Sequence, residues 1–347
     1  MKPFLCACGN RIFFENVQCL KCQRELGFVP EHGTLASLEP ADDGTYRAHV
    51  DPERPRRKCQ NYQTEGVCNW LCEPLDENPL CRACQLNRIV PDLSIPENRV
   101  KWARIETAKR RLLFTLAELG LPVKPKSLDP ERGLAFDFKA DTQDSVVLTG
   151  HDDGVVTLKL DEADPVLRER ARVSLRERYR SLLGHFRHEV GHYYFDRLVA
   201  NGPRIDEFRA LFGDERQDYG EALKRHYARP ASDWSADFVS GYAQAHPWED
   251  WAESFAHYLH MVDTLETAET YTTSARETRL LSSREAALVE RWLELTVVLN
   301  ALNRSMGLED AYPFEIGDGA RRKIEFVQSI VDEHRQEATR DSTNQRA

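Results

Sequence analysis

The sequence lacks long apolar segments, a basic surplus and any cysteine beyond its first quarter. No run of about 18 uncharged apolar residues occurs, so no transmembrane helix and no membrane partner are predicted. The first residues, MKPFLCACGNRIFF, contain neither the apolar core of a signal peptide nor a small-residue cleavage site, so we expect a cytoplasmic protein. The net charge of −10 argues against a general nucleic-acid binder.

All nine cysteines lie between Cys6 and Cys84. In a reducing compartment, this clustering favours thiolates that bind metal over disulfides. The first group has two short pairs separated by a hairpin-length segment, the usual way to place four sulfurs around one structural zinc: Cys6, Cys8, Cys19 and Cys22. Free thiols are the alternative. A redox C-x-x-C is disfavoured because no βαβ pattern surrounds these pairs.

The second group offers five cysteines for four ligand positions, and it predicts a second structural zinc. Cys81 and Cys84 form the secure pair. The other two ligands come from Cys59, Cys68 and Cys72, and the spacing leaves that choice open. Free thiols are again the alternative.

Residues 29–57 separate the two groups and are rich in Pro, Asp, Glu and Gly. This composition predicts a loop or linker with room for a short strand. A basic run at residues 54–58 could contact phosphate, as in some zinc ribbons. In an acidic chain we interpret it instead as a solvated surface, so nucleic acid is not an expected partner.

Pro91 and Pro96 mark a boundary, so we expect a Cys-rich zinc-ribbon region at 1–95, a second domain at 96–335 and a disordered polar tail at 336–347. The second domain should be mainly helical with a short β-sheet, which makes the chain α+β. Periodicity predicts helices near 98–119, 284–305 and 320–334, strands at 134–138, 145–149 and 155–160, and a hairpin turn at 150–154. An edge strand of such a sheet could hold an extended peptide, although an ordinary sheet edge has the same pattern.

The most informative stretch is HFRHEVGHYYFDRLV at residues 185–199, which contains the HExxH pattern. On a helix, His188 and His192 lie one turn apart on one face and can offer two imidazole nitrogens to one zinc. Glu189 can then reach a water on the open side of the metal. Gly191 lowers helix propensity, so we expect a close neighbour at that position, either backbone or metal.

A second amphipathic helix is predicted at residues 248–265, WEDWAESFAHYLHMVDTL. Besides its apolar face it has a stripe of two carboxylates and two imidazoles: Glu249, Glu253, His257 and His260. A hydrogen-bonded polar surface would give the same stripe. A catalytic zinc keeps three protein ligands and one open position, so the third ligand should come from this helix. Glu253 is central on the stripe and is our choice, with Glu249, His257 and Asp250 as alternatives.

Taken together, these motifs resemble a bacterial family of zinc-binding metallopeptidases that carry an N-terminal zinc-ribbon domain. The resemblance covers nearly the whole chain and depends on FFEN and its cysteines (13–22), CNW (68–70), CRACQLNRIVPDL (81–93), AKRRLL (108–113), LTGHDDGVVTL (148–158), LLGHFRHEVGHYYFDRLV (182–199) and HPWEDWAESFAHYLHMVDTLETA (246–268).

This resemblance implies a zincin-like second domain with a gluzincin-like site. In it, His188, His192 and Glu253 would bind the catalytic zinc, and Glu189 would be the catalytic base. In the second cysteine group the family pattern matches Cys59, Cys68, Cys81 and Cys84, which leaves Cys72 as the spare. The chain would then bind one catalytic and two structural zinc ions.

The predicted activity is metal-assisted hydrolysis of a peptide or protein substrate, in which Glu189 takes the proton of the attacking water. A stabiliser of the developing oxyanion is also needed, and the candidates are His257, His246, Tyr242 and Tyr312. Two alternatives are a scaffold protein with a non-catalytic zinc and a hydrolase of non-peptide amides. The zinc ribbons are a candidate surface for a protein partner.

Overall fold

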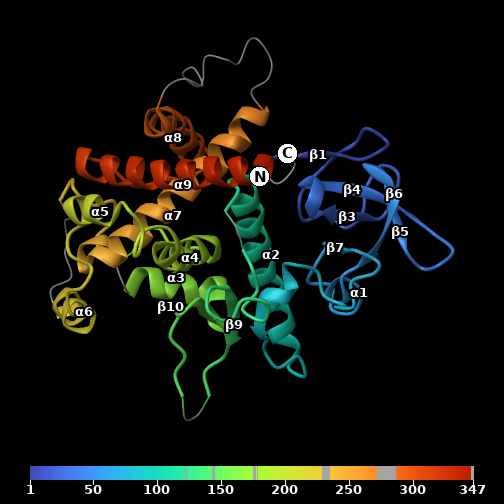
Figure 1. Cartoon of the computed structure of the whole chain (residues 1–347), viewed down its shortest axis with the longest axis horizontal. Helices are drawn as coiled ribbons and strands as arrows, with labels where there is room; N and C mark the ends of the chain where they lie inside the picture. The colour runs from blue at the N-terminus through green and yellow to red at the C-terminus, as the bar shows by residue number, and fades with distance from the viewer. Residues whose placement is uncertain are drawn as a thin grey trace. The chain divides into compact units, whose positions relative to one another are not determined.

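The structure is a computed structural model that describes residues 1–121, 123–142, 145–174, 177, 179–228, 235–271 and 287–344 (Figure 1). The chain divides into two compact units. The first unit extends from Met1 to Arg168 without Leu119–Leu121. The second unit consists of Leu119–Leu121 and the residues from Glu169 onward. The chain is α+β, as predicted, with a Cys-rich N-terminal region followed by a helical part. Among the described residues, no helix is both long enough and apolar enough to cross a bilayer.

The N-terminal region consists mainly of short antiparallel strands. A two-stranded sheet pairs β1 (Phe4–Leu5) with β2 (Arg11–Ile12). A five-stranded sheet follows in the order β3-β4-β5-β6-β7. Its strands are β3 (Leu26–Val29), β4 (Thr34–Pro40), β5 (Tyr46–Ala48), β6 (Asp51–Lys58) and β7 (Leu71–Cys72). The prediction of a loop or linker at residues 29–57 is therefore wrong, because this segment supplies three central strands.

Two features stabilise strands in a segment of such polar composition. One is a small apolar core under the sheet, formed by Val29, Ala36, Leu38, Ala48 and Leu71. The other is charge neutralisation. Arg56 is fully buried, and its guanidinium lies 2.7 Å from a Glu31 oxygen and 2.9 Å from a Glu73 oxygen. Lys58 is buried beside Glu25 at 2.7 Å. The interpretation of residues 54–58 as a solvated surface is thus wrong for Arg56 and Lys58, because buried charges require partners.

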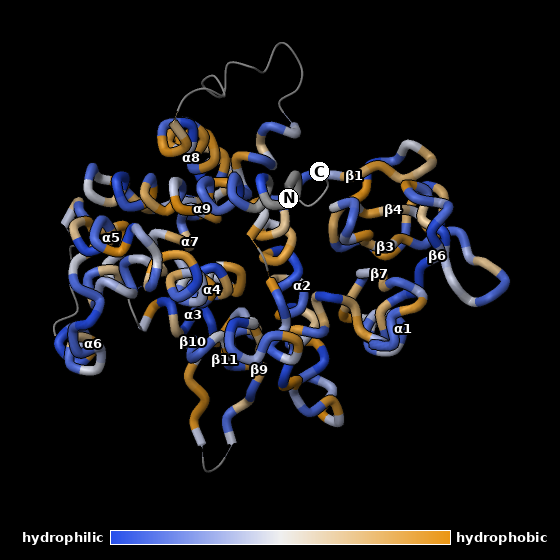
Figure 2. Tube along the Cα trace, in the orientation of Figure 1, coloured by the Kyte–Doolittle hydropathy of each residue, from blue (hydrophilic) through white to orange (hydrophobic). Residues whose placement is uncertain are grey.

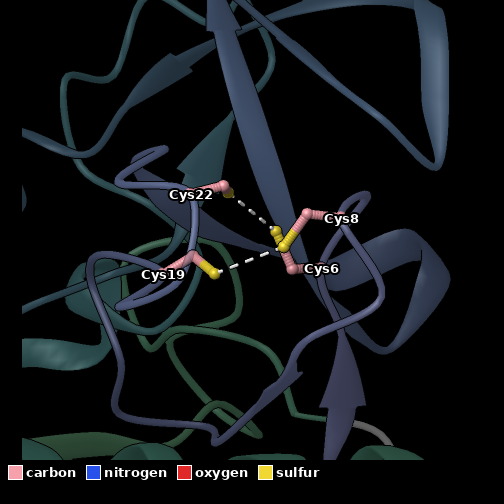
Figure 3. Close-up of side chains that lie close together, drawn as sticks. All are labelled: Cys6, Cys8, Cys19 and Cys22. Carbon is pink, nitrogen blue, oxygen red and sulfur yellow. Dashed lines mark hydrogen bonds between the residues drawn. The ribbon is translucent and has the colours of Figure 1, made fainter.

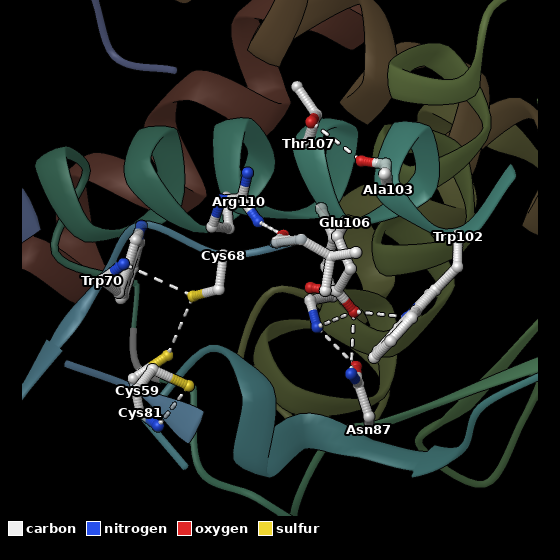
Figure 4. A network of polar contacts seen from close by, with 12 residues as sticks. Cys59, Cys68, Trp70, Cys81, Asn87, Trp102, Ala103, Glu106, Thr107 and Arg110 are labelled. Carbon is white, nitrogen blue, oxygen red and sulfur yellow. Dashed lines mark hydrogen bonds and ion pairs between the residues drawn. The ribbon is translucent and has the colours of Figure 1, made fainter. Parts of the chain in front are cut away.

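A short helix, α1 (Gln60–Gln63), and a strand, β8 (Asn87–Ile89), lead to a long helix, α2 (Pro96–Glu118), close to the range predicted from its periodicity. The strand β8 pairs in parallel with β9 (Ala135–Lys139). Parallel neighbours require a long crossover, and α2 lies within it. A buried polar cluster joins strand and helix: Lys109 Nζ lies 2.9 Å from Glu106 Oε1 and also donates to Asn87 (Figure 4).

The four-stranded sheet has the order β10-β11-β9-β8, so β10 (Gly150–Asp152) is an edge strand. It forms a hairpin with β11 (Val155–Lys159), close to the predicted last strand. The predicted strand at 145–149 is wrong, because the hairpin is tighter than expected. Its turn consists of Asp153 and Gly154 alone, both with positive φ (42° and 72°). Asp-Gly favours this two-residue turn. The turn is shorter than predicted, so the strand before it lies at 150–152 and not at 145–149.

The second unit is helical. The division falls within α3 (Pro165–Ser174). The elements after it are α4 (Leu182–Leu198), α5 (Ile205–Phe212), α6 (Tyr219–Ala228), η4 (a 3-10 turn at Tyr242–Ala245), α7 (Pro247–Tyr271), α8 (Leu288–Ser305) and α9 (Asp318–Asn344). Hydrophilic and apolar residues alternate along α9 in Figure 2, and its apolar residues Ile324, Val327 and Val331 are buried. The predicted disordered tail is wrong up to residue 344, because α9 continues through this polar segment as a helix. Residues 345–347 lie outside the described residues.

Candidate active site

The site forms where α4 crosses α7. Helix α4 begins after Ser181, whose hydroxyl accepts a hydrogen bond from Gly184 N at 3.0 Å, a standard N-cap. Helix α7 begins with Pro247 at its first position, where a missing N–H costs nothing, and has Glu249 and Asp250 in its first turn. The two helices are antiparallel, because Arg187 pairs with Asp263, Gly191 approaches Ala252 and His192 packs against Trp248.

Gly191 is the point of closest approach. A Cβ added there would lie 2.9 Å from Ala252 Cα and 3.1 Å from Ala252 O. The predicted close neighbour is therefore the backbone of α7. Two polar contacts fix the crossing: Trp251 Nε1 donates to Gly191 O at 2.8 Å, and the buried Arg187 lies 2.6 Å from Asp263 Oδ2.

The crossing brings three potential metal ligands together. Glu249 Oε2 lies 3.0 Å from His188 Nε2 and 3.4 Å from His192 Nε2. One ligand atom from each of these three residues falls within 4.8 Å of the others. Both His192 and Glu249 are buried. Burial acts to raise the pKa of Glu249, but the imidazoles of His192 and His188 more than offset it and hold that pKa well below its usual range.

Glu253, the predicted third ligand, has a different position. Its Oε1 lies 2.8 Å from His188 Nδ1, the ring nitrogen opposite the one that faces Glu249. Its Oε2 accepts from Ser240 Oγ at 2.5 Å. Since a carboxylate can only accept, His188 Nδ1 carries a proton, and Nε2 is the ring nitrogen left to bind a metal. In the absence of metal, burial acts to lower the pKa of His188, but Glu249 and Glu253 outweigh burial and hold that pKa well above its usual value. The cluster of potential ligand atoms thus contains Glu249, one helical turn before Glu253, whose two oxygens face His188 Nδ1 and Ser240 instead.

These residues fit a metal ion. The Glu249 side chain is 1% exposed, and among the described residues no donor makes a hydrogen bond to its Oε2. A buried carboxylate oxygen without a hydrogen bond, facing two imidazole nitrogens, is the arrangement that a cation satisfies. Two nitrogens and one oxygen are also a donor set that leaves a fourth position of a tetrahedral zinc open.

Glu189 lies beside the first of these ligands on α4 and is 7% exposed. No described residue makes a hydrogen bond or ion pair with its carboxylate. Burial raises the pKa of Glu189 to about 7, His188 opposes the rise, and Glu249 and Glu253 add to it. A cation bound at the imidazoles would favour the ionised form, which is the form that accepts a proton.

The four candidate oxyanion stabilisers do not gather at one place. His257 Nδ1 lies 2.6 Å from Tyr312 Oη, so these two side chains are partners of each other. His246 is at the start of α7, where its Nδ1 accepts from Trp248 N at 3.1 Å. Tyr242 is the candidate beside the ligands, with its ring 5.8 Å from that of His188. Burial raises the pKa of Tyr242, so its hydroxyl stays protonated and able to donate.

Sequence reasoning missed Tyr219 and Ser240, each of which contacts a carboxylate of the site. Tyr219 Oη donates to Glu249 Oε1 at 2.6 Å. Neither residue lies in HExxH or on the second helix, and no local spacing links them to those motifs. Only the fold brings α6 and the turn before η4 to the start of α7.

The first cysteine group converges as predicted (Figure 3). Cys6 Sγ lies 3.6 Å from Cys22 Sγ, and Cys8 Sγ lies 3.7 Å from Cys19 Sγ. The four sulfurs form one cluster that could bind a metal ion. Four thiol sulfurs at these separations match the tetrahedral set of a structural zinc.

The second cluster contains Cys59, Cys68, Cys81 and Cys84, all of them buried. In Figure 4, Cys68 Sγ faces Cys81 Sγ at 3.7 Å, and the peptide next to this cluster is tied to α2 by Arg110, which donates to Val67 O. Cys72 lies outside this set of four, on β7, although its thiol is close enough to Cys59 to hydrogen-bond with it. The grouping agrees with the set that the resemblance implied.

Two family models match the chain. One is described as "Putative zinc-binding metallo-peptidase" and matches residues 98–330; the other is a zinc-ribbon domain and matches residues 3–95. Similar proteins, each named "Uncharacterized protein", occur in two strains of Mycobacterium tuberculosis and in Mycobacterium bovis. Each is 42% identical over 341 residues, which is 96% of either chain. No solved structure matches the chain.

The close crossing makes a prediction for Gly191→Ala. The new methyl group would lie 2.9 Å from a backbone atom that cannot rotate away. Such overpacking costs about 1–3 kcal/mol, against a gain in helix propensity of about 1 kcal/mol. We expect a net loss of unfolding free energy and weaker zinc binding, measured by denaturant unfolding and chelator competition.

Gly184→Ala, on the first turn of the same helix, is the matched control. Its methyl group would meet Ser181 Oγ at 3.1 Å and the Tyr179 ring at 3.4 Å, so it can weaken the N-cap of α4 but does not meet α7. Zinc affinity is therefore the deciding readout, and equal zinc affinity in the two variants would contradict a crossing limited by Gly191.

The second cysteine cluster gives another paired prediction. Cys72→Ser should retain the zinc of this cluster, whereas Cys59→Ser should lose it and unfold the local strands, because structural zinc contributes directly to folding. Metal analysis of the purified variants measures the difference. If Cys72→Ser lost the zinc and Cys59→Ser retained it, Cys72 would be the ligand and Cys59 the spare cysteine.

Proposed function

Because the chain belongs to the zinc-binding metallopeptidase family, we propose that it is a zinc-dependent peptidase that hydrolyses peptide bonds with water. The observation that supports this most is the convergence of His188 Nε2, His192 Nε2 and Glu249 Oε2, with Glu189 beside them and not paired with any residue that the structure describes. A scaffold would need only the ligands, whereas a hydrolase also needs a base, and Glu189 supplies one.

We assign His188, His192 and Glu249 as the ligands of the catalytic zinc, and Glu253 as the residue that orients His188. The hydrogen bond to His188 Nδ1 fixes both the tautomer and the ring orientation, which is the usual role of a carboxylate behind a metal-binding imidazole. Ser240 in turn fixes Glu253. The two cysteine clusters would bind one structural zinc each.

The mechanism needs one general base and one donor to the developing oxyanion. His188, His192 and Glu249 would hold a zinc ion, and the chemistry that it would supply when bound is that of a Lewis acid acting on the substrate carbonyl and on water. Glu189 accepts the proton of the attacking water and delivers it to the leaving amine. Tyr242, beside His188, is the donor best placed to stabilise negative charge on the carbonyl oxygen.

The ligand assignment predicts different effects for the two carboxylates of α7. Glu249→Gln removes a charged ligand and should abolish binding of the catalytic zinc at micromolar concentrations. Glu253→Gln removes a partner of a ligand and should weaken zinc binding by about 10–100-fold. Zinc affinity by chelator competition measures both. A larger loss in Glu253→Gln than in Glu249→Gln would restore Glu253 as the ligand.

The mechanism predicts that Glu189→Gln keeps its zinc and loses its activity. Glu189 is not a ligand, so the metal content should equal that of the wild type. Positioned acid–base catalysis typically contributes about 10²–10⁴-fold, so kcat should fall by at least about 100-fold on a peptide that the wild type cleaves. A peptide library analysed by mass spectrometry provides that substrate.

Two outcomes would count against the peptidase proposal. Hydrolysis by Glu189→Gln at the rate of the wild type would exclude Glu189 as the base. If the zinc-loaded wild type instead cleaved no peptide but hydrolysed small non-peptide amides, the protein would be an amidohydrolase and not a peptidase.

A further inference from the structure

Glu249 has two oxygens with different surroundings. Its Oε2 faces the two imidazoles, whereas its Oε1 accepts a hydrogen bond from Tyr219 Oη at 2.6 Å. The carboxylate is 1% exposed, so water cannot easily reach it. Loss of a hydrogen-bond partner would therefore leave a buried oxygen unsatisfied, which is costly. Tyr219 is therefore the residue that keeps one oxygen of Glu249 occupied and leaves the other for the metal.

The position of Tyr219 is itself constrained. Its ring packs edge-on against Trp248 and His246, with ring centroids 5.6 Å and 5.4 Å away. These two residues flank Pro247 at the start of α7, and Tyr219 is the first residue of α6. The phenol thus connects the first turn of α6 to the first turn of the helix that carries the ligand.

We propose that Tyr219 is a positioning residue of the catalytic metal centre, which fixes Glu249 for binding through Oε2. The proposal depends on the assignment of Glu249 as a ligand. Partners behind a metal ligand hold its orientation before the metal arrives, so they raise affinity without touching the ion. Tyr242 differs from Tyr219 in position, because its ring lies beside His188, although the two hydroxyls also interact with each other.

A reciprocal effect follows from this contact. If the Tyr219 hydrogen bond strengthens zinc binding, then bound zinc must strengthen the Tyr219 contact by the same factor. Since Tyr219 is the first residue of α6, zinc should stabilise residues 219–228. A tyrosine with a merely structural role would stabilise α6 equally with and without metal.

The test uses full-length Tyr219→Phe, which keeps the ring and removes only the hydroxyl. Its affinity for the catalytic zinc, measured by chelator competition, should fall by about 10–100-fold, while the two cysteine clusters retain their metal. Zinc should slow amide hydrogen exchange in α6 of the wild type and do so much less in Tyr219→Phe.

Tyr227→Phe is the control on the same helix, because Tyr227 is 60% exposed and, in the described part of the chain, Glu249 accepts its hydroxyl hydrogen bond from Tyr219 and not from Tyr227. It should bind zinc like the wild type and show the same slowing of exchange. Wild-type zinc affinity in Tyr219→Phe, with zinc lost from Glu249→Gln, would overturn this proposal alone. Retention of the catalytic zinc in Glu249→Gln would instead overturn the ligand assignment from which it follows.

Discussion

The close contact between α4 and α7 at Gly191 is the constraint on which the site depends. Two helices carry the three proposed ligands and the base, and their axes can approach this closely because Gly191 has no Cβ where Ala252 comes within van der Waals distance. The pair Arg187–Asp263 and the bond from Trp251 to Gly191 O fix the same crossing from either side. A carboxylate on one helix can then reach the imidazoles on the other.

The electrostatics of the crossing explain why a cation belongs there. Glu189, Glu249 and Glu253 lie close around His188 and His192, in a region largely shielded from water. Buried carboxylates without full compensation are costly, and the two imidazoles compensate three carboxylates only in part. A divalent ion would neutralise this excess of negative charge. The donors that neutralise it are those that zinc prefers, and the base is left outside the ligand set.

The sequence predicted the parts of the site that local periodicity determines. Helical periodicity predicts that His188 and His192 share a face and that residues 248–265 form a helix. Low helix propensity predicts a close neighbour at Gly191. Periodicity does not decide between Glu249 and Glu253, because both lie on one stripe, and only the crossing geometry decides which carboxylate faces Nε2. Tyr219 was missed because no local spacing links it to Glu249, and the strands within 29–57 were missed because their composition is polar. Arg56 in that sheet is paired with Asp51 on its own strand and with Glu31 and Glu73 elsewhere in the chain.

The most direct test of the central claim is an anomalous-diffraction map, recorded at the zinc edge from crystals of the zinc-loaded full-length protein. The account predicts three peaks. Two should lie within the cysteine clusters, and the third should lie about 2.0–2.2 Å from His188 Nε2, His192 Nε2 and one oxygen of Glu249. A third peak bound by Glu253 instead of Glu249, or no peak between the two imidazoles, would contradict the account.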